Sequence, residues 1–96
     1  MKKKKISVNI GIIGCGYWGP NLVRNFSAVD DCYVRYCCDL DANRLKYIKR
    51  LYPFVEVTKE YKRVIEDPAI DSIIIATPVS THFPIAMKAL EAGKNV

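Results

Sequence analysis

The sequence has no long hydrophobic run. The longest strand-sized apolar stretch, Ile73–Ala76, is far shorter than the roughly 18 residues that cross a bilayer. The chain starts with the basic run Lys2–Lys5, but Ile6–Ile13 contains Ser, Asn and Gly and leads to no cleavage site of small residues. This pattern argues against a signal peptide, so we expect a cytoplasmic protein with no membrane partner.

Residues that bind metals are few and poorly spaced. There is one histidine, His82, and the four cysteines (Cys15, Cys32, Cys37 and Cys38) form no Cys-x-x-Cys pair. Free thiols are the usual state of such cysteines inside a cell. We therefore predict no metal site.

The sequence also lacks a concentrated basic segment in its body. The formal net charge is +5, but four of the fifteen basic residues are Lys2–Lys5, at a terminus that we expect to be mobile. The others are scattered among acids, whereas a nucleic-acid interface gathers Lys and Arg on one folded surface. We expect no nucleic-acid partner. With half its 96 residues hydrophobic and 26% charged, the chain has the composition of one globular domain.

Strand-like and helix-like stretches alternate along the whole chain. Apolar runs predict strands at Val8–Ile13, Tyr33–Cys38, Phe54–Val57 and Asp71–Ala76, the last buried on both faces. Helical periodicity predicts helices over Trp18–Ala28, between Asp41 and Pro53, around Tyr61–Ile65 and over Phe83–Ala92. Strands separated by helices indicate a parallel sheet with right-handed crossovers.

Individual residues refine these helices. Leu22, Phe26 and Val29 form the apolar stripe of the first helix, and Asp41 is the predicted N-cap of the second. We predict further caps at Thr58 and at Ser80 or Thr81. In the last helix we expect the inward residues to be Ile85, Ala86, Ala89 and Leu90, with Gly93 ending it and Asn95-Val96 opening a fifth strand.

The strongest motif is Gly14-Cys15-Gly16-Tyr17-Trp18-Gly19, a Gly-x-Gly-x-x-Gly pattern. It follows the first strand directly, opens a helix, and precedes Asp39 by twenty residues. This context is typical of dinucleotide binding. Gly14 suits the tight turn, Gly16 the approach of a diphosphate, and Gly19 the close packing of helix on sheet. The N–H groups of Tyr17 and Trp18 are candidates for diphosphate contacts; their rings are expected to pack, with Trp18 alternatively walling the cleft.

Asp39 closes the second strand, where an acid can accept hydrogen bonds from the adenosine ribose. Its charge would repel a 2′-phosphate, which favours NAD over NADP. Arg44 argues against this preference, since its positive side chain could reach the same pocket. Its alternative role is an ion pair with Asp41 or Asp39.

A second candidate site follows the fourth strand. Thr77 and Pro78 are expected to line the nicotinamide side of the crevice, because ligands of such sheets bind where the strand order reverses. His82, at the start of the next helix, has two open roles: cofactor contact, or a hydrogen bond that holds the loop.

The segment Ile12–Leu22, Asp71–Pro78 with His82, and Ala89–Val96 resemble the N-terminal domain of the glucose–fructose oxidoreductase, inositol dehydrogenase and rhizopine catabolism (Gfo/Idh/MocA) family. The resemblance spans nearly the whole chain. Tyr17–Asn21 is most similar to bacterial members of the UDP-N-acetylglucosamine or UDP-acetamido-glucuronate 3-dehydrogenase kind, in polysaccharide biosynthesis. We therefore expect an α/β, Rossmann-like, doubly wound parallel sheet of order 3-2-1-4 with a truncated fifth strand, in three layers.

The resemblance implies an NAD(P)-dependent dehydrogenase that oxidises a hydroxyl of a sugar or sugar nucleotide. The family's catalytic Glu-Lys-Pro motif and a C-terminal α/β domain, which binds substrate and forms a homo-oligomer, would follow Val96; Lys94 is not the catalytic lysine. Residues 1–96 would then be an incomplete NAD(P)-binding domain, inactive alone and without catalytic residues. The alternative is a non-catalytic NAD-binding or nucleotide-sensing module.

Overall fold

Four parallel strands form the centre of the molecule. The computed structural model describes residues 7–16 and 18–96. Its strands are β1 (Val8–Ile13), β2 (Cys32–Cys38), β3 (Glu56–Thr58) and β4 (Ser72–Ile75), in the spatial order β3-β2-β1-β4. This order confirms the predicted doubly wound sheet. From β1 to β3 each new strand is added on one side, and β4 is added on the other side of β1, so the strand order reverses between β1 and β4.

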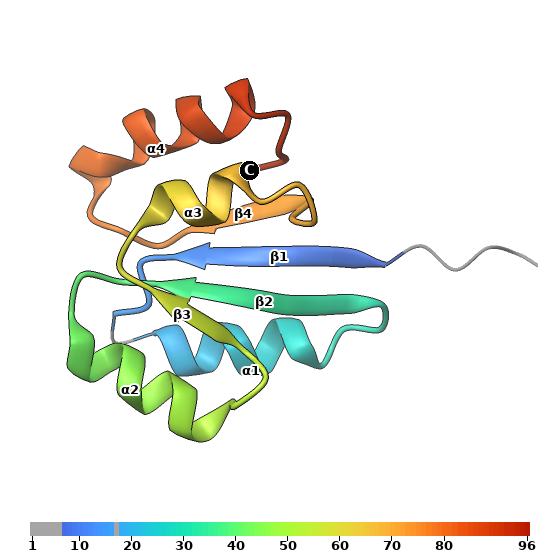
Figure 1. Ribbon diagram of the computed structural model, residues 1–96, viewed down its shortest axis with the longest axis vertical. Coiled ribbons are helices and arrows are strands. Elements are labelled where there is room, and N and C mark those ends of the chain that lie inside the picture. The colour runs from blue at the N-terminus through green and yellow to red at the C-terminus, as the bar shows by residue number, and fades with distance from the viewer. Residues whose placement is uncertain (1–6, 17) are drawn as a thin grey trace, which may run out of the picture.

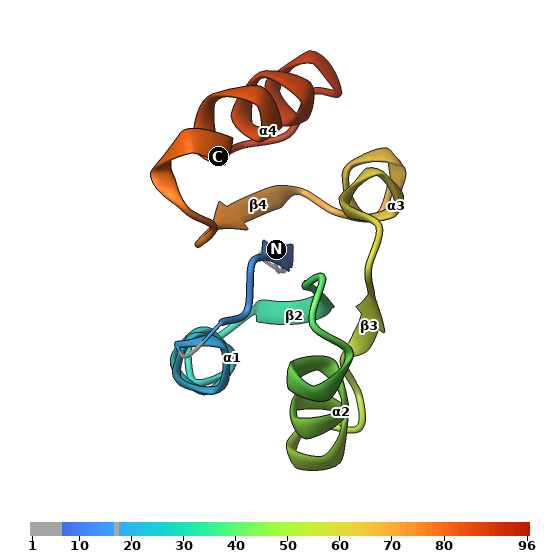
Figure 2. The same ribbon diagram turned by 90° about the vertical axis from the view of Figure 1, so that its left-hand side faces the viewer.

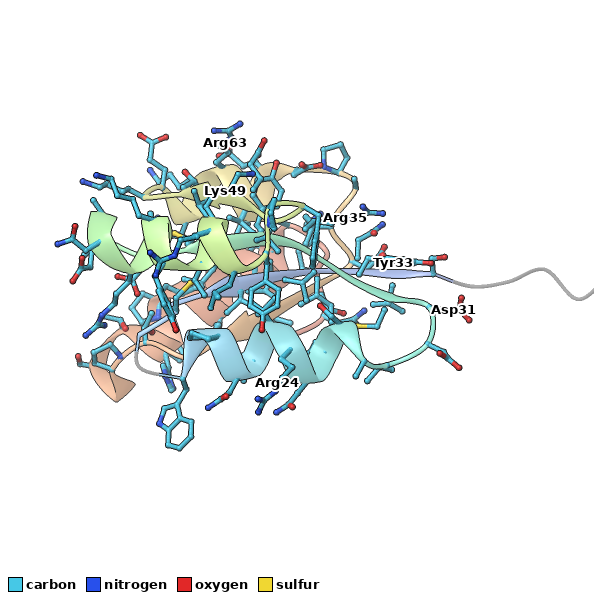
Figure 3. All side chains as sticks on the ribbon, turned by 90° about the horizontal axis from the view of Figure 1, so that it is seen from below. Arg24, Asp31, Tyr33, Arg35, Lys49 and Arg63 are labelled. Atoms are coloured by element: carbon cyan, nitrogen blue, oxygen red, sulfur yellow. The ribbon has the colours of Figure 1, made fainter. Side chains whose placement is uncertain are left out.

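Helices cover both faces of the sheet, which makes the three predicted layers. The helices α1 (Gly19–Ser27) and α2 (Ala42–Leu51) lie on one face, and α3 (Tyr61–Glu66) and α4 (Val79–Glu91) on the other (Figures 1 and 2). Charged side chains stand on both outer sides: Arg24 projects from α1 and Arg63 from α3, on opposite sides of the sheet (Figure 3).

Each face of the sheet has its own hydrophobic core. Alternate residues of β1 serve the two cores, because successive side chains of a strand point to opposite faces. The core under α1 and α2 includes Ile10, Ile12, Val23, Val34, Leu45 and Ile48. The core under α3 and α4 includes Ile13, Val64, Ile65, Ile73, Ile85 and Ala89. Burial on two faces explains why β1 reads as an almost unbroken apolar run.

The capping of α2 is as predicted. The Asp41 carboxylate accepts hydrogen bonds from the backbone N–H groups of Asn43, at 2.8 Å, and Arg44, at 3.3 Å. These are donors that the first turn of a helix cannot satisfy internally. The last hydrogen bond of α2 runs from Tyr52 to Ile48, just before Pro53.

The other cap predictions were wrong. The helix α4 starts at Val79 instead of Phe83, with Pro78 as N-cap, so Ser80 and Thr81 lie inside its first turn. The Thr81 hydroxyl instead donates to the Pro78 carbonyl at 2.8 Å. Thr58 accepts a hydrogen bond from the Glu60 N–H at 3.1 Å, but the N-cap of α3 is Glu60 itself.

Two predicted core positions face solvent. Val29 is 55% exposed, because α1 ends at Ser27, and Val23 fills the core in its place. Leu90 is 56% exposed, next to the fully buried Ala89 of α4. The prediction that the Asp71–Ala76 strand is buried on both faces was also wrong, since Ile74 and Ile75 of β4 are only half-buried.

The chain continues beyond α4 alongside β4. Gly93 has a φ of +80° just after the helix, and Asn95 forms a parallel bridge with Ser72, where the fifth strand was expected to open. Within residues 7–16 and 18–96, no helix has the length and apolar character to cross a membrane.

Candidate functional site

The carboxyl ends of the strands meet at one edge of the sheet, the edge that faces the viewer in Figure 2. Four connections leave it, and three of them contact one another: Gly14–Trp18 (here the glycine loop), the turn at Asp39–Asp41 between β2 and α2, and Ala76–Pro78 between β4 and α4. The fourth joins β3 to α3. These connections come from segments far apart in the sequence, so only the parallel sheet brings them together. This is the edge at which open α/β sheets bind ligands.

Gly14 lies where the glycine loop touches the β4–α4 connection. Its φ is +89°, and a Cβ there would lie 2.7 Å from Thr77 Cγ2, 2.8 Å from Thr77 N and 2.9 Å from Ala76 C. Any side chain would therefore collide with backbone. The absence of a side chain lets the two loops touch across the crevice.

The other two glycines have different roles. Gly16 has a φ of +48°, a left-handed conformation that glycine adopts without strain. Gly19 begins α1, and a Cβ on it would lie 2.7 Å from the Cβ of Cys15. Close contact between the helix and the loop thus requires a glycine, which agrees with the packing role proposed for Gly19.

The glycine loop leads directly into the start of α1. The first N–H groups of any helix have no partner inside it, and together they carry partial positive charge. Trp18 is the N-cap and is 64% exposed, so its ring is not buried as packing would require; the alternative, that Trp18 walls the cleft, stays a prediction. Tyr17, the other residue predicted to contact a diphosphate, lies outside the described residues.

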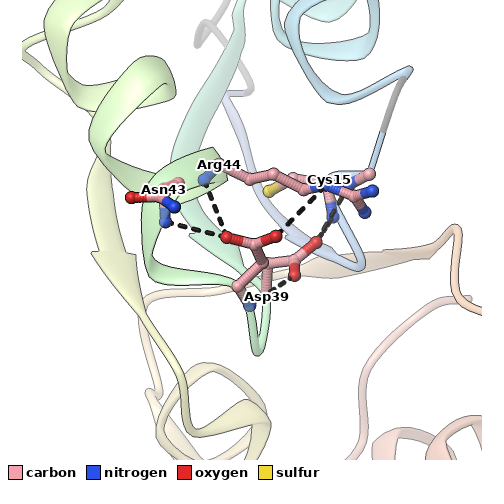
Figure 4. Close-up of polar contacts among 6 residues, drawn as sticks. Cys15, Asp39, Asn43 and Arg44 are labelled. Carbon is pink, nitrogen blue, oxygen red and sulfur yellow. Dashed lines mark hydrogen bonds and ion pairs between the residues drawn. The ribbon is translucent and has the colours of Figure 1, made fainter.

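Asp39 is tied to the glycine loop. Its Oδ2 accepts hydrogen bonds from the N–H of Cys15 at 3.0 Å and of Gly16 at 2.9 Å, and its Oδ1 accepts one from the N–H of Asp41 at 2.8 Å (Figure 4). The sequence predicted that Asp39 would close the second strand and bind the adenosine ribose. It did not predict that the carboxylate would bind the loop's own backbone.

Arg44 lies close to the glycine loop and to Asp41. It makes a loose ion pair with Asp41, 3.8 Å between Nε and Oδ2, and its Nη1 is 3.5 Å from where a Cβ of Gly16 would lie. The guanidinium thus borders the glycine loop from the side of α2. An open pocket of about 510 Å³ lies there, lined by Gly16, Pro20, Asn21, Asn43, Arg44, Tyr47 and Ile48.

His82 holds the β4–α4 connection. Its Nε2 is hydrogen-bonded to the Thr77 carbonyl, so this nitrogen carries the proton. Thr81 Oγ1 bonds Thr77 Oγ1 at 2.6 Å, which fastens Thr77 a second time. The His82 hydrogen bond is the loop-holding role left open for this residue, and its contact with a cofactor stays a prediction. Thr77 lies against Gly14, and the role of Thr77 and Pro78 in lining the nicotinamide side stays a prediction.

Three cysteines near the site, Cys15, Cys37 and Cys38, are buried and unpaired by disulfides. A hydrogen bond with Cys37, together with burial, raises the pKa of the Cys15 thiol far above its usual value, and burial raises that of Cys38 to about 11. Since the thiolate is the reactive form, the raised pKa values disfavour reaction at Cys15 and Cys38. No group of three or more His, Cys, Asp or Glu in the described part of the chain could hold a metal.

Leu40 is a residue that sequence reasoning missed. It follows Asp39 directly and is 84% exposed, a large apolar side chain in solvent at the same edge of the sheet. The signal was present as a lone apolar residue between two aspartates, outside any periodic segment.

The chain also matches a known family along nearly its whole length. Residues 8–96 match the Gfo/Idh/MocA model, described as an oxidoreductase family with an NAD-binding Rossmann fold. The chain belongs to this family. The resemblance carried by the glycine motif, Asp71–Pro78 and Ala89–Val96 is thereby confirmed, and the finer likeness to dehydrogenases of UDP-sugars is not shown.

Two relatives match nearly the whole of this chain over about a quarter of their own length. The uncharacterized oxidoreductase YdgJ of Escherichia coli is 53% identical over 94% of this chain and 25% of its own length. The scyllo-inositol 2-dehydrogenase (NADP(+)) IolW of Bacillus subtilis is 30% identical over 99% of this chain and 26% of its own. The chain therefore spans about a quarter of the length of these relatives.

A solved structure shows the same fold. It is the scyllo-inositol dehydrogenase of Lactobacillus casei with bound NAD(H) and scyllo-inositol. This protein superposes with a TM-score of 0.82 at 24% identity, over 92% of this chain and 26% of that one. At this identity the likeness is one of fold. It agrees with the strand order and layers described above.

Proposed function

We propose that this chain binds NAD(P) at the carboxyl edge of its sheet and forms the cofactor-binding part of a dehydrogenase. The observation that carries the proposal is the contact of three segments there: the glycine loop, Asp39 bonded to it, and Thr77 against Gly14. Family membership supports the same reading. When bound, a nicotinamide cofactor accepts or donates a hydride.

The residues fit such a cofactor from one end to the other. The diphosphate would lie at the N-terminus of α1, the adenosine ribose at Asp39, and the nicotinamide side along Thr77 and Pro78. Leu40 offers an exposed apolar surface beside the ribose position for a purine ring. We assign no catalytic residue within the chain.

We propose that NAD is preferred over NADP. A 2′-phosphate would approach the Asp39 carboxylate, and two negative groups at such distances repel. Arg44 opposes this preference, since its guanidinium borders the same pocket and is free of any tight ion pair with Asp41. The NADP(+) in the name of the relative IolW shows that the family includes users of that cofactor.

Calorimetric titration with NAD⁺, NADH and NADP⁺ in parallel tests these assignments. We expect NADH to bind and NADP⁺ to bind more weakly. Asp39→Ala should lower the affinity for NAD⁺ and narrow the difference in affinity between NAD⁺ and NADP⁺. Arg44→Gln should lower the affinity for NADP⁺ more than that for NAD⁺. A folded chain that binds none of the three would refute the cofactor site.

We propose a hydroxyl of a sugar or cyclic polyol as substrate. The inositol dehydrogenases among the relatives favour a cyclic polyol over the nucleotide-linked sugar predicted from Tyr17–Asn21. A panel of inositols, hexoses and UDP-sugars, supplied with NAD⁺ and followed by NADH absorbance on the whole protein, separates these classes. Cofactor binding without turnover on any of them would favour the alternative, a non-catalytic nucleotide-sensing module.

We further propose that the protein is a cytoplasmic homo-oligomer, as the family resemblance implies. Light scattering coupled to size-exclusion chromatography of the whole protein, and cell fractionation, test the two parts. A monomeric protein would contradict the first, and recovery in the membrane fraction would contradict the second.

A further inference from the structure

The Asp39 carboxylate also forms contacts within the protein itself. It accepts three backbone hydrogen bonds, two from the glycine loop (Cys15 and Gly16) and one from Asp41 (Figure 4). We propose that Asp39 is a positioning residue that holds the glycine loop in its binding shape before any cofactor arrives. The consequence for the ligand rests on the proposed function; the effect on the loop does not.

The loop needs such a tie because the sheet stops supporting it. The hydrogen-bond ladder between β1 and β2 ends where the Gly14 N–H donates to the Cys38 carbonyl at 2.7 Å. Beyond that point Gly14 and Gly16 have φ values of +89° and +48°, and glycine gains the most freedom when such a conformation is released. The Asp39 carboxylate continues the ladder, because it accepts hydrogen bonds from the next two N–H groups, those of Cys15 and Gly16.

Asp39 is itself well anchored, so it can hold the loop. Its own N–H donates to the Thr58 carbonyl of β3 at 3.2 Å, and its Oδ1 is held by the Asp41 N–H, at the cap of α2. The carboxylate therefore connects the glycine loop to two other segments of the sheet edge. Movement of the loop away from the sheet would break both bonds to Oδ2.

The arrangement also divides the donors between protein and ligand. A carboxylate offers about four acceptor positions, two on each oxygen. Oδ2 uses two on the loop and Oδ1 uses one on Asp41, which leaves a position on Oδ1 for a ribose hydroxyl. The N–H groups of Cys15 and Gly16 face Asp39, so a diphosphate takes its hydrogen bonds from donors further along, at the start of α1.

Amide hydrogen exchange in the ligand-free chain tests the proposal directly. In Asp39→Ala we expect the amides of Cys15 and Gly16 to exchange about tenfold faster or more, the loss that corresponds to a charge-assisted hydrogen bond. Amides of core residues such as Val34 should keep their rates. Asp41→Asn is the matched control, since it removes one negative charge two residues away and leaves the hydrogen bonds to Asp39 Oδ2 intact. In this variant the exchange rates of the Cys15 and Gly16 amides should stay within about twofold of those in the unsubstituted chain.

A second variant keeps the test sharp if alanine impairs folding. Asp39→Asn retains the shape and one acceptor oxygen, so an intermediate acceleration is expected at the same two amides. Unchanged exchange at Cys15 and Gly16 in both Asp39 variants would overturn the proposal.

The effect on ligands is measured with ADP and 2′,3′-dideoxy-ADP, which lacks both ribose hydroxyls. If Asp39 acted only through the ribose, its substitution would not alter affinity for the dideoxy compound. We expect Asp39→Ala to bind both compounds more weakly than Asp41→Asn does, because its glycine loop is less ordered. For the dideoxy compound the loss of affinity should be about threefold or more. Equal dideoxy-ADP affinity in the two variants would overturn the coupling. Failure of the unsubstituted chain to bind ADP or NADH would refute the proposed function, and the exchange result would stand.

Discussion

Replacing Gly14 by alanine is the sharpest perturbation of the site that the structure offers. The new methyl group would lie 2.7–2.9 Å from three atoms of the β4–α4 connection, of which two, Thr77 N and Ala76 C, belong to the backbone. A side chain can rotate away from a methyl group, but backbone atoms at the end of a paired strand cannot. The glycine loop and the β4–α4 connection must therefore separate by several tenths of an ångström.

Two costs add up in this variant. A residue with a Cβ at a φ of +89° pays roughly 1–2 kcal/mol for its left-handed conformation. Forcing a methyl group into an occupied place costs a further 1–3 kcal/mol or so. The free energy of unfolding should fall by about 2–5 kcal/mol, which is a large part of the roughly 5–14 kcal/mol expected for a domain of this length.

Gly93 supplies the matched control. Its φ is +80°, close to that of Gly14, but no heavy atom lies within 4 Å of its Cβ position. Gly93→Ala therefore measures the conformational cost alone, about 1–2 kcal/mol. The difference between the two variants is the cost of separating the two loops.

Urea unfolding followed by circular dichroism gives both free energies, and calorimetry gives the affinity for NADH. We expect Gly14→Ala to lose more stability than Gly93→Ala by at least 1 kcal/mol or so and to bind NADH more weakly, while Gly93→Ala binds it normally. Equal stability loss in the two variants would refute the argument that the loops touch at Gly14.

Three further substitutions test the rest of the fold. Asp41→Ala removes the cap of α2 and should cost about 1 kcal/mol in urea unfolding; no loss would mean that the cap is unused. Ile73→Ala, at a fully buried position, should cost about 2–5 kcal/mol, and a loss below 1 kcal/mol or so would contradict the packing between β4 and α4. The Tyr36 hydroxyl donates to Asp67 at 2.6 Å, which lowers the pKa of Asp67 and raises that of Tyr36 to about 12. Stability from the Asp67 shift is present above the usual carboxyl pKa and lost as pH falls below it. Stability from Tyr36 is present below about pH 10, its usual pKa, and lost as pH rises toward 12. Tyr36→Phe should flatten both limbs of a pH–stability curve, and unchanged limbs would show that the pair is not formed.

The sequence by itself determined the elements and their order. Apolar runs marked the strands, Asp41 marked the start of α2, and the glycine motif with Asp39 marked one edge of the sheet. These signals are local: strand and helix periodicity, caps and turns depend on residues within a few positions of one another. The order 3-2-1-4 was expected from the family resemblance, and the right-handed crossovers agree with it.

Only the tertiary structure decided which atoms of the site meet. The contact of Gly14 with Thr77, and the two hydrogen bonds from the glycine loop to Asp39, join residues from different strands through the register of the sheet. The exposure of Val29 and Leu90 was decided in the same way, because a periodic pattern cannot show where a neighbouring strand or helix stops. A side chain's partners depend on distances across the fold, and those exist only once the sheet has assembled.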